Sequence, residues 1–412
     1  MSSVLIESEI GTLEKVILHR PGGEVELMNP QAAQEALFDD IISLAGAQQE
    51  HDQLAAALRQ FGEVCELQTL LAETMEIEEA RRTVIEGLCE EFGCPELVPE
   101  LLELPGRELA ERLVLGTPSH PTALAQFLPD HAYALPPMFN LYFTRDAAMC
   151  VHDRVIVGAM ANRTRWPESL VMQALFRHHP ALRPEGFYLD GSTQPARVTV
   201  EGGDVLVLRD DLILIGQGER TSITGIDRLL QAFARTGKVR HVIVQEIPKA
   251  RAFIHFDMVF TMLDRDLCMI YEPIVQGGWT RGPILMELEA GQPPRMERHA
   301  DLLTLLKELG MPLTPVLTGG KEPLHQTREQ WQKGTNFFAM APGKVIGFRR
   351  NEHTYRELEQ HGFRVVTGED VLAGRVDLTA PGRVAVAMEG AELSRGGGGC
   401  RCMTLPVRRA RL

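Results

Sequence analysis

The sequence predicts an α/β fold built from repeated modules, and three observations lead to this prediction. Four short apolar hairpins recur along the chain, at residues 149–157, 205–215, 259–271 and 337–348. Each hairpin is followed by a stretch of helical character. A short cluster of polar residues precedes nearly every hairpin. Irregularly spaced modules of this kind suit a propeller better than a short-repeat solenoid, although an ordinary α+β sheet would also contain hairpins.

The elements of these modules can be placed in chain order. An opening unit is expected as a strand at residues 13–19, a helix over residues 31–60 and a strand near Val64. The helices predicted after the four hairpins span residues 167–177, 222–236, 301–309 and 355–360. In the second of these, apolar residues from Ile226 to Phe233 recur on one helical face. The clearest closing strands are residues 241–244 and 364–366.

One segment breaks this rhythm. Residues 73–136 show almost no strand pattern, and apolar residues from Ile77 to Phe92 recur at helical spacing between prolines and glycines. We therefore expect a helical insert domain at residues 73–136 and an α/β propeller catalytic domain formed by residues 1–72 and 137–412. Cys89 and Cys94 lie in the insert without a second ligand pair, so buried thiols are favoured over a zinc site.

Composition narrows the class of partner. The 412-residue chain has a formal net charge of -14, which argues against nucleic acid as a ligand because phosphates attract Lys and Arg. The N-terminal segment has no basic region followed by a long apolar run, so we expect no signal peptide. No apolar stretch approaches the roughly 18 residues of a membrane-spanning helix, so we expect no membrane span. The seven scattered cysteines do not form a disulfide pattern, and a reducing cytoplasm is the expected location.

His255 and Asp257 form the first candidate for chemistry. On a strand, side chains at positions i and i+2 point to the same face. The flanking residues Phe253, Ile254 and Met258 are apolar, so this pair is expected to be buried or to line a cleft. A buried His–Asp pair satisfied by its own partners is the commoner outcome for a single match of this kind.

Cys402 is the candidate nucleophile. It follows the glycine run at residues 396–399 and the pair Cys400–Arg401. Glycines let a backbone approach a ligand closely, and neighbouring positive charge turns a thiol into a nucleophile. A flexible tail with two exposed thiols explains the glycine run equally well, although the apolar segment 403–407 continues beyond it.

Two further polar groups precede hairpins. Glu201 and Asp204 are separated by two glycines and could crowd a guanidinium or a metal ion, although an acidic turn is the simpler interpretation of this segment alone. Asn140 and Asp146 lie in a run of strand-forming residues, where polar side chains are less readily explained by a turn. A thiol, an imidazole and several carboxylates brought together would form a nucleophilic site for a cationic substrate.

Taken together, these segments resemble the arginine deiminases, members of the guanidino-group-modifying pentein superfamily. The matching segments occur in the family's order, and they are residues 38–40, 140–146, 201–204, 216–220, 255–257, 328–331 and 402–404. The resemblance implies a five-module α/β propeller with a small all-helical insert. The insert expected at residues 73–136 lies where that family carries one.

The resemblance also implies roles for individual residues. Cys402 would attack the guanidinium carbon, His255 would act as acid and base with Glu201 orienting it, and Asp146 and Asp257 would hold the guanidinium plane. The residues implied in substrate binding are Asn140, Phe143, Arg165, Asp204 and Arg220. No metal or organic cofactor is implied.

Several positions depart from the family pattern. Phe256 and Met258 stand where Leu and Thr are usual, and Gly397 stands where many members have an arginine that gates the substrate carboxylate. The expected reaction is hydrolysis of free L-arginine to L-citrulline and ammonia. A related guanidine such as a methylated arginine, amidino transfer, and arginine binding without catalysis are the alternatives. We expect a cytoplasmic homo-oligomer, a dimer or a tetramer, that acts on this small molecule.

Overall fold

The computed structural model describes residues 2–119, 133–279 and 281–412. Its first sheet joins the two ends of the chain, in the order β2–β1–β20. Strand β1 (Leu13–Leu18) pairs antiparallel with β20 (Leu405–Arg409) and parallel with β2 (Glu63–Glu66). Three helices lie between β1 and β2 in the chain, and they are α1 (Gly23–Glu26), α2 (Pro30–Glu35) and α3 (Leu44–Arg59).

Two further sheets repeat this arrangement of an antiparallel pair extended by a parallel strand. In one, β5 (Ala148–Val151) and β6 (Arg154–Val157) form the hairpin, and β7 (Phe187–Asp190) follows helix α9 (Trp166–His178). In the next, β8 (Val205–Arg209) and β9 (Leu212–Gln217) form the hairpin, and β10 (His241–Glu246) follows helix α10 (Ile223–Thr236). The Ser222 side chain caps the start of α10 by accepting the Gly225 N–H. An outer hairpin of β13 (Ile284–Glu287) and β14 (Arg295–Arg298) extends this sheet.

The other two large sheets follow the same plan with one variation. Strands β11 (Phe260–Met262) and β12 (Leu267–Ile270) form a hairpin, and β12 pairs parallel with β15 (Thr314–Leu317), which follows α11 (Glu272–Val275) and α12 (Leu302–Glu308). Strands β16 (Phe338–Ala341) and β17 (Lys344–Phe348) come after α13 (Pro323–Trp331). Here the parallel neighbour of β17 is β19 (Arg383–Met388), and β18 (Phe363–Thr367) lies at the edge beyond it. Helices α14 (Glu352–Gln360) and α15 (Gly368–Leu372) flank β18 in the chain.

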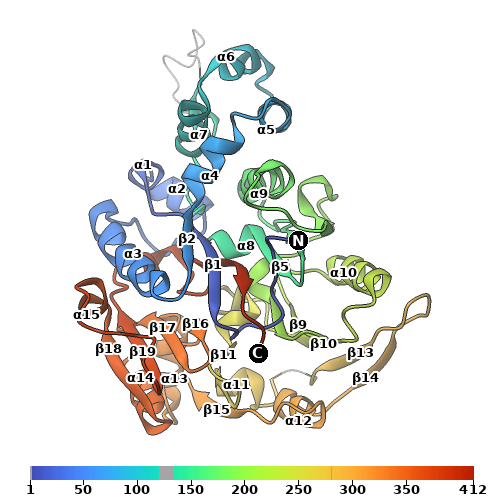
Figure 1. The fold of residues 1–412 in the computed structure, drawn as a ribbon, viewed down its shortest axis with the longest axis vertical. Helices are drawn as coiled ribbons and strands as arrows, with labels where there is room; N and C mark the ends of the chain where they lie inside the picture. The colour runs from blue at the N-terminus through green and yellow to red at the C-terminus, as the bar shows by residue number, and fades with distance from the viewer. Residues whose placement is uncertain (1, 120–132, 280) are drawn as a thin grey trace.

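A group of helices projects from the sheets at the top of Figure 1. Its members are α4 (Leu67–Thr74), α5 (Glu78–Phe92), α6 (Val98–Glu103) and α7 (Gly106–Leu115). Strands β3 (Thr117–Pro118) and β4 (Tyr133–Leu135) follow, on either side of residues 120–132, which lie outside the described residues. Cys89 and Cys94 are buried in this group as free thiols, as the sequence predicts. In the described part of the chain, no helix is both long and apolar enough to span a bilayer.

All four predicted hairpins are confirmed, as are the helices that follow them. The helix predicted over residues 31–60 is wrong, because α2 ends at Glu35 and α3 begins at Leu44. Leu37 has a positive φ of 65°, which an α-helix cannot contain, and the Ser43 side chain caps a new helix start. The break places Ala36, Leu37 and Asp39 at the wall of the functional cavity.

The strand expected for His255 and Asp257 is also wrong. The segment Phe256–Met258 is a 3₁₀ turn, η6, and strand β11 begins only at Phe260. The Phe256 N–H donates to Oδ1 of Asp204 at 2.8 Å, so a side chain takes the place of a strand partner for this backbone group. Asp146 likewise lies in a short helix, α8 (Thr144–Ala147), rather than in a strand.

Candidate active site

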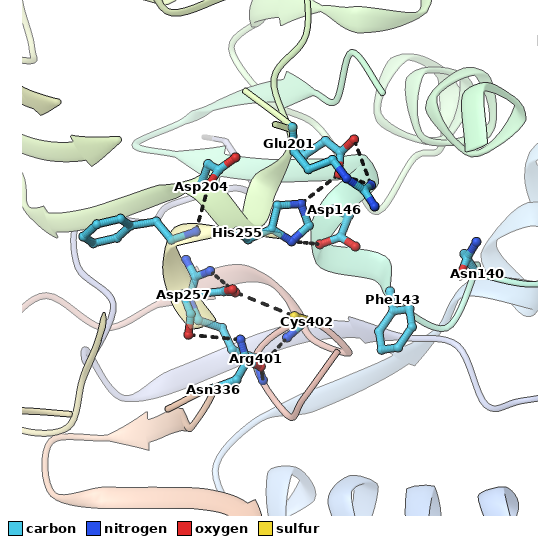
Figure 2. Close-up of polar contacts among 12 residues, drawn as sticks. Asn140, Phe143, Asp146, Glu201, Asp204, His255, Asp257, Asn336, Arg401 and Cys402 are labelled. Atoms are coloured by element: carbon cyan, nitrogen blue, oxygen red, sulfur yellow. Dashed lines mark hydrogen bonds and ion pairs between the residues drawn. The ribbon is translucent and has the colours of Figure 1, made fainter. Parts of the chain in front are cut away.

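Polar side chains from segments far apart in the sequence meet at one cavity of about 260 Å³. Asp146 comes from α8, and His255 directly precedes η6. Cys402 follows the glycine run at residues 396–399, which begins at the last residue of η7 (Leu393–Gly396). Figure 2 shows these three side chains facing one another. Their ligand-type atoms all lie within 4.8 Å of one another, and all three residues are buried. The turns that follow or precede the strands therefore bring a carboxylate, an imidazole and a thiol to one point.

His255 lies between two carboxylates. Its Nε2 atom is 2.8 Å from Oε2 of Glu201, and its Nδ1 atom is 3.7 Å from Oδ1 of Asp146. Burial alone would lower the pKa of His255, but Asp146, Cys402 and Glu201 outweigh it and raise that pKa well above its usual value. Glu201 also accepts from Arg220 at 3.2 Å, and the net effect lowers the pKa of Glu201 to about 2 despite its burial. His255 is therefore an imidazolium held by a charged carboxylate.

Asp146 is held on its outer side by Arg165. Nη1 of Arg165 donates to Oδ2 of Asp146 at 2.7 Å, while Nε and Nη2 of the same guanidinium donate to Glu168 at 3.0 and 2.7 Å. Both Arg165 and Glu168 are buried. A bidentate pair of this kind fixes the direction of a guanidinium, which in turn fixes the Asp146 carboxylate.

Asp257 is held by a second buried arginine. Nη1 of Arg401 donates to Oδ2 of Asp257 at 2.8 Å, and Nε and Nη2 of Arg401 donate to Glu9 at 3.0 and 3.1 Å. Asn336 ties this group to the nucleophile, since its Oδ1 accepts from the backbone N–H of Arg401 and of Cys402 at 3.0 and 3.2 Å. Its Nδ2 donates to the Asp257 carbonyl at 3.3 Å. Asn336, which lies just before strand β16, thus fixes the backbone around Cys402.

The thiol of Cys402 lies beside negative charge. Its Sγ atom is 3.8 Å from Oδ2 of Asp257. Burial and the charges of Asp257 and Asp146 raise the pKa of Cys402 to about 11, although His255 opposes them. These charges favour a protonated thiol next to an imidazolium, and a bound cation would shift this balance toward the thiolate.

Three buried polar atoms at this point have no hydrogen-bond partner among the described residues. They are Oδ1 of Asp146, Oδ1 of Asp257 and Nδ1 of His255. An unpaired buried carboxylate oxygen is costly, so such atoms mark a place where a donor is expected to bind. The two resident arginines occupy the Oδ2 atoms and leave both Oδ1 atoms available.

The structure brings most of the residues predicted for substrate binding to the cavity wall. The predicted residues that line it are Asn140, Phe143, Asp146, Arg165, Arg220, His255 and Cys402. Glu201, Asp204 and Asp257 lie behind this lining. Asp204 accepts from the Phe256 N–H, and burial raises its pKa to about 7. Asp204 therefore supports the His255 segment from behind.

Sequence reasoning assigned no role to several residues of this region. Glu9, Glu168 and Arg401 form the buried ion pairs described above, and Lys333 lines the cavity. Arg401 directly precedes Cys402, so its positive charge near the thiol could be seen in the sequence. Glu9 and Lys333 carry no local motif.

The trio of Asp146, His255 and Cys402 has the atoms to hold a metal ion such as zinc. Metal binding requires a deprotonated thiol and a neutral imidazole. The raised pKa values of Cys402 and His255 favour the opposite protonation states. The site therefore fits a planar cation that donates hydrogen bonds better than a metal ion.

Solved structures with a similar fold support the architecture described above. An amidinotransferase from Microseira wollei, of the saxitoxin biosynthetic pathway, has a TM-score of 0.56 at 15% sequence identity, and the match covers 100% of this chain and 98% of that one. The N-terminal domain of ArgZ, a cyanobacterial arginine dihydrolase, has a TM-score of 0.53 at 13% identity and covers 96% of this chain and 97% of that one. This chain therefore has the same mixed α/β fold as these two proteins.

The sequence identifies the family. The family model of arginine deiminase matches residues 34–101 and 110–409. An arginine deiminase from Bacillus cereus (strain ATCC 10987 / NRS 248) is 36% identical over 424 residues, which cover 98% of this chain and 97% of that protein. One from Streptococcus gordonii (strain Challis) is 35% identical over 422 residues with the same coverage. The chain belongs to the arginine deiminase family.

Proposed function

We propose that this protein hydrolyses free L-arginine to L-citrulline and ammonia through a covalent intermediate on Cys402. One structural observation supports this proposal in addition to the family membership. The unpaired oxygens of Asp146 and Asp257 and the unpaired Nδ1 of His255 belong to side chains that surround a buried thiol. A guanidinium group offers planar N–H donors for the two carboxylate oxygens and a carbon atom for the thiol.

Substrate binding prepares the nucleophile. The guanidinium of arginine would donate to Oδ1 of Asp146 and of Asp257, which fixes its plane and leaves Cys402 facing its central carbon. The positive charge of the substrate also offsets the two carboxylates that raise the pKa of the thiol. The thiol then loses its proton more readily when arginine is bound than when the cavity is empty.

Two steps complete the reaction. In the first, the Cys402 thiolate forms a C–S bond to the guanidinium carbon, and one C–N bond breaks as His255 protonates the departing ammonia. In the second, neutral His255 takes a proton from water as the water oxygen attacks the same carbon. The C–S bond then breaks, citrulline leaves, the second proton of the water passes to solvent, and the thiolate and the imidazolium are restored. Glu201 keeps the imidazole oriented through both steps.

The remaining predicted residues are proposed to hold the amino-acid end of arginine or its surroundings. Arg165, Arg220, Asn140 and Phe143 all line the cavity. Phe143 also contacts the glycine run, because a Cβ atom added at Gly398 would lie 2.5 Å from its ring. Asp204 is proposed to act indirectly, through its hydrogen bond to the Phe256 backbone.

The architecture supports three wider proposals. Five sheets, each with an antiparallel strand pair extended by a parallel strand, are consistent with a five-module α/β propeller. The catalytic domain is proposed to comprise residues 1–72 and 137–412, with residues 73–136 as the helical insert. A cytoplasmic homo-oligomer stays a prediction, and the seven free cysteines support a reducing location.

Turnover of L-arginine tests the proposed function directly. Wild-type protein is expected to release citrulline and ammonia in equal amounts, and Cys402→Ser is expected to release none. Cys400→Ser is the matched control, because it removes a buried thiol two residues away that faces Met388 instead of the cavity. A panel of methylated arginines, with and without an amine acceptor, tests the two rival reactions. Citrulline formation by Cys402→Ser at the wild-type rate would refute the mechanism.

A further inference from the structure

The glycine run that leads to Cys402 depends on its two ends for its position. Residues 396–399 are all glycine, so this stretch has no side chains with which to bind a neighbouring element. Beyond the run, the side chain of Asn336 and the N–H of Arg145 hold the backbone of Cys402, whose carbonyl accepts from Arg145 at 3.0 Å. Before the run lies the 3₁₀ helix η7. The place of the thiol therefore depends also on what holds η7.

A buried carboxylate on helix α3 binds the start of η7. Oε2 of Glu50 accepts from the Leu393 N–H at 2.8 Å. Both carboxylate oxygens of Glu50 accept from the Glu392 N–H, at 3.0 and 3.2 Å. N–H groups at the start of a helix have no partner within the helix, so a carboxylate at this point satisfies them and fixes the helix in place.

Glu50 makes these contacts without a cation of its own. No cation pairs with Glu50 in the described part of the chain, and its side-chain hydrogen bonds all go to this one segment. Burial raises the pKa of Glu50, and the backbone N–H groups of residues 391–393 oppose that effect. A buried carboxylate is costly unless its hydrogen bonds are made, so its place in the fold depends on η7.

The contact between the two helices is reciprocal. The Glu392 carboxylate accepts the N–H of Ser43, the residue that caps α3, at 2.8 Å. Glu50 of α3 thus binds the start of η7, and Glu392, at the start of η7, binds the start of α3. We call this arrangement the Glu50–Glu392 double cap. A Cβ atom at Gly46, in the first turn of α3, would lie 2.8 Å from Cγ of Glu392, so the glycine leaves room for this side chain.

Further contacts tie the segment before α3 to η7. The Asp39 N–H donates to the Arg395 carbonyl at 2.6 Å, and Nη1 of Arg395 lies 2.9 Å from Oδ2 of Asp40. Asp39 lines one wall of the cavity, and residues 396–398 line another. Together with the double cap, these contacts hold the two walls in a fixed relation. Glu50 is the buried charge in this set.

We propose that Glu50 is a positioning residue of the reaction, which sets the place of the Cys402 thiol by capping η7. The inference rests on the proposed function, because it takes Cys402 as the nucleophile. Glu50 lies outside the cavity lining, so it acts through η7 and the glycine run. Loss of its acceptors would move the run and draw the thiol away from the guanidinium carbon. Asp146 and Asp257, on other segments, would still hold the guanidinium.

Glu50→Ala and Glu50→Gln test the inference. Glu50→Ala removes both acceptor oxygens, whereas Glu50→Gln keeps the shape and one of them. Gly46→Ala is an independent variant that leaves Glu50 in place. Alanine favours the helix at this position, but its Cβ atom would displace the Glu392 side chain and so disturb the double cap from its other side.

Gln53→Ala is the matched control. Gln53 lies three residues further along α3 and is 6% exposed, the same fraction as Glu50. Its Oε1 accepts the Glu389 N–H at 3.0 Å, so it also joins α3 to the segment before η7. It does not reach η7 itself. Gln53→Ala should therefore lose a buried hydrogen bond and keep its kcat.

We expect kcat for L-arginine to fall roughly 10–10²-fold in Glu50→Ala, the loss that a displacement of about 1 Å produces. KM should rise by a smaller factor, because the acceptors of the guanidinium stay in place. Glu50→Gln should fall between Glu50→Ala and wild-type protein. Gly46→Ala should lower kcat in the same direction.

Alkylation of Cys402 by iodoacetamide reports the surroundings of the thiol without any turnover of arginine. It is measured in the Cys400→Ser background, so that an adduct on this peptide lies on Cys402. Burial and Asp257 raise the pKa of Cys402 to about 11, and release of the run removes both effects. The alkylation midpoint of Glu50→Ala should therefore fall from about 11 toward the ordinary value of 9.0. A residue that served stability alone would leave this midpoint unchanged in the folded protein.

An unchanged kcat together with an unchanged alkylation midpoint in folded Glu50→Ala would overturn the inference. A rise in KM at unchanged kcat would also overturn it, because the cap would then act on binding instead of on the thiol. If Glu50→Ala does not fold, the same two measurements on Glu50→Gln and Gly46→Ala decide. A wild-type protein that binds L-arginine without forming citrulline would overturn the proposed reaction instead, and the alkylation midpoint would still decide the role of Glu50.

Discussion

Nε2 of His255 lies 2.8 Å from Oε2 of Glu201, and both side chains are buried. Figure 2 shows the imidazole between this carboxylate and that of Asp146. A charged acceptor at this distance keeps the ring protonated and fixes its orientation toward Cys402. The contact with Glu201 therefore keeps His255 protonated and oriented so that it can donate a proton to the departing ammonia.

Glu201→Gln should therefore lower the pKa of His255, because Glu201 is among the groups that raise it. The imidazolium would then be lost at a lower pH, so the basic limb of the kcat/KM profile should move to lower pH. We expect kcat to fall roughly 10²–10⁴-fold with loss of the oriented acid. Glu246→Gln, at an exposed site, is the control. An unmoved basic limb would show that another group titrates there.

Asp257→Asn should lower the pKa of the Cys402 thiol, because the charge of Asp257 raises it. The rate of alkylation by iodoacetamide, followed against pH, reports this thiolate. The midpoint for the variant should lie below that of the wild-type protein, whose thiol pKa is about 11. The same variant should lose most arginine turnover, since one acceptor of the guanidinium is gone. A midpoint at higher pH would contradict the charge arrangement.

The buried pair of Glu9 and Arg401 should make stability depend on pH. The pKa of Glu9 is lowered from 4.5 to about 2 in the folded protein, because Arg401 and Arg145 outweigh its burial. Its contribution is therefore complete above the unfolded value of 4.5 and is lost as the pH falls through about 2. Urea unfolding of Glu9→Gln should show a flatter dependence across this window than wild-type protein does.

Arg401→Met should be more damaging than Glu9→Gln, since it leaves two carboxylates buried without their cation. We expect the free energy of unfolding to fall by about 3–5 kcal/mol. Urea unfolding at neutral pH measures this change. A loss under about 1 kcal/mol would show that the pair contributes little to folding.

Gly398→Ala should displace the catalytic loop. A Cβ atom there would lie 2.5 Å from the Phe143 ring and 2.9 Å from Cβ of Cys402. We expect a stability loss of about 1–3 kcal/mol and a fall in kcat/KM of roughly 10²-fold, because the thiol moves relative to the guanidinium. Gly93→Ala is the control, since it has a positive φ of 66° but open space around it. That variant should lose stability and keep its kcat/KM.

Local patterns predicted most of the secondary structure. Short apolar runs on either side of a polar turn marked the four hairpins, and the helical repeat marked α9 and α10. The pairing of β1 with β20 could not be predicted, because it joins residues at opposite ends of the chain. The β13–β14 hairpin was missed because Arg295–Arg298 is exposed and strongly polar, with no buried face to produce alternation.

The site was less accessible to local reasoning. The motifs around Cys402 and His255, taken singly, fitted a flexible tail and a buried ion pair as well as a catalytic site. The resemblance to the arginine deiminases, carried by several segments in the family's order, favoured the catalytic site. The roles of Glu9 and Lys333 depend on partners hundreds of residues away, Arg401 and Asp39 respectively. Lys333 follows a helix end, where a basic residue is ordinary. The structure shows that Lys333 has a positive φ of 65° and lines the cavity, and composition reveals neither feature.

The central claim is a covalent bond between Cys402 and the guanidinium carbon of arginine. Acid quenching of the enzyme during turnover, followed by mass spectrometry of the Cys402 peptide, tests this claim most directly. The account predicts an adduct with the mass of arginine less ammonia, present on Cys402 and absent from Cys400. Steady citrulline formation with an unmodified Cys402 peptide at every quench time, together with full activity of Cys402→Ser, would contradict it.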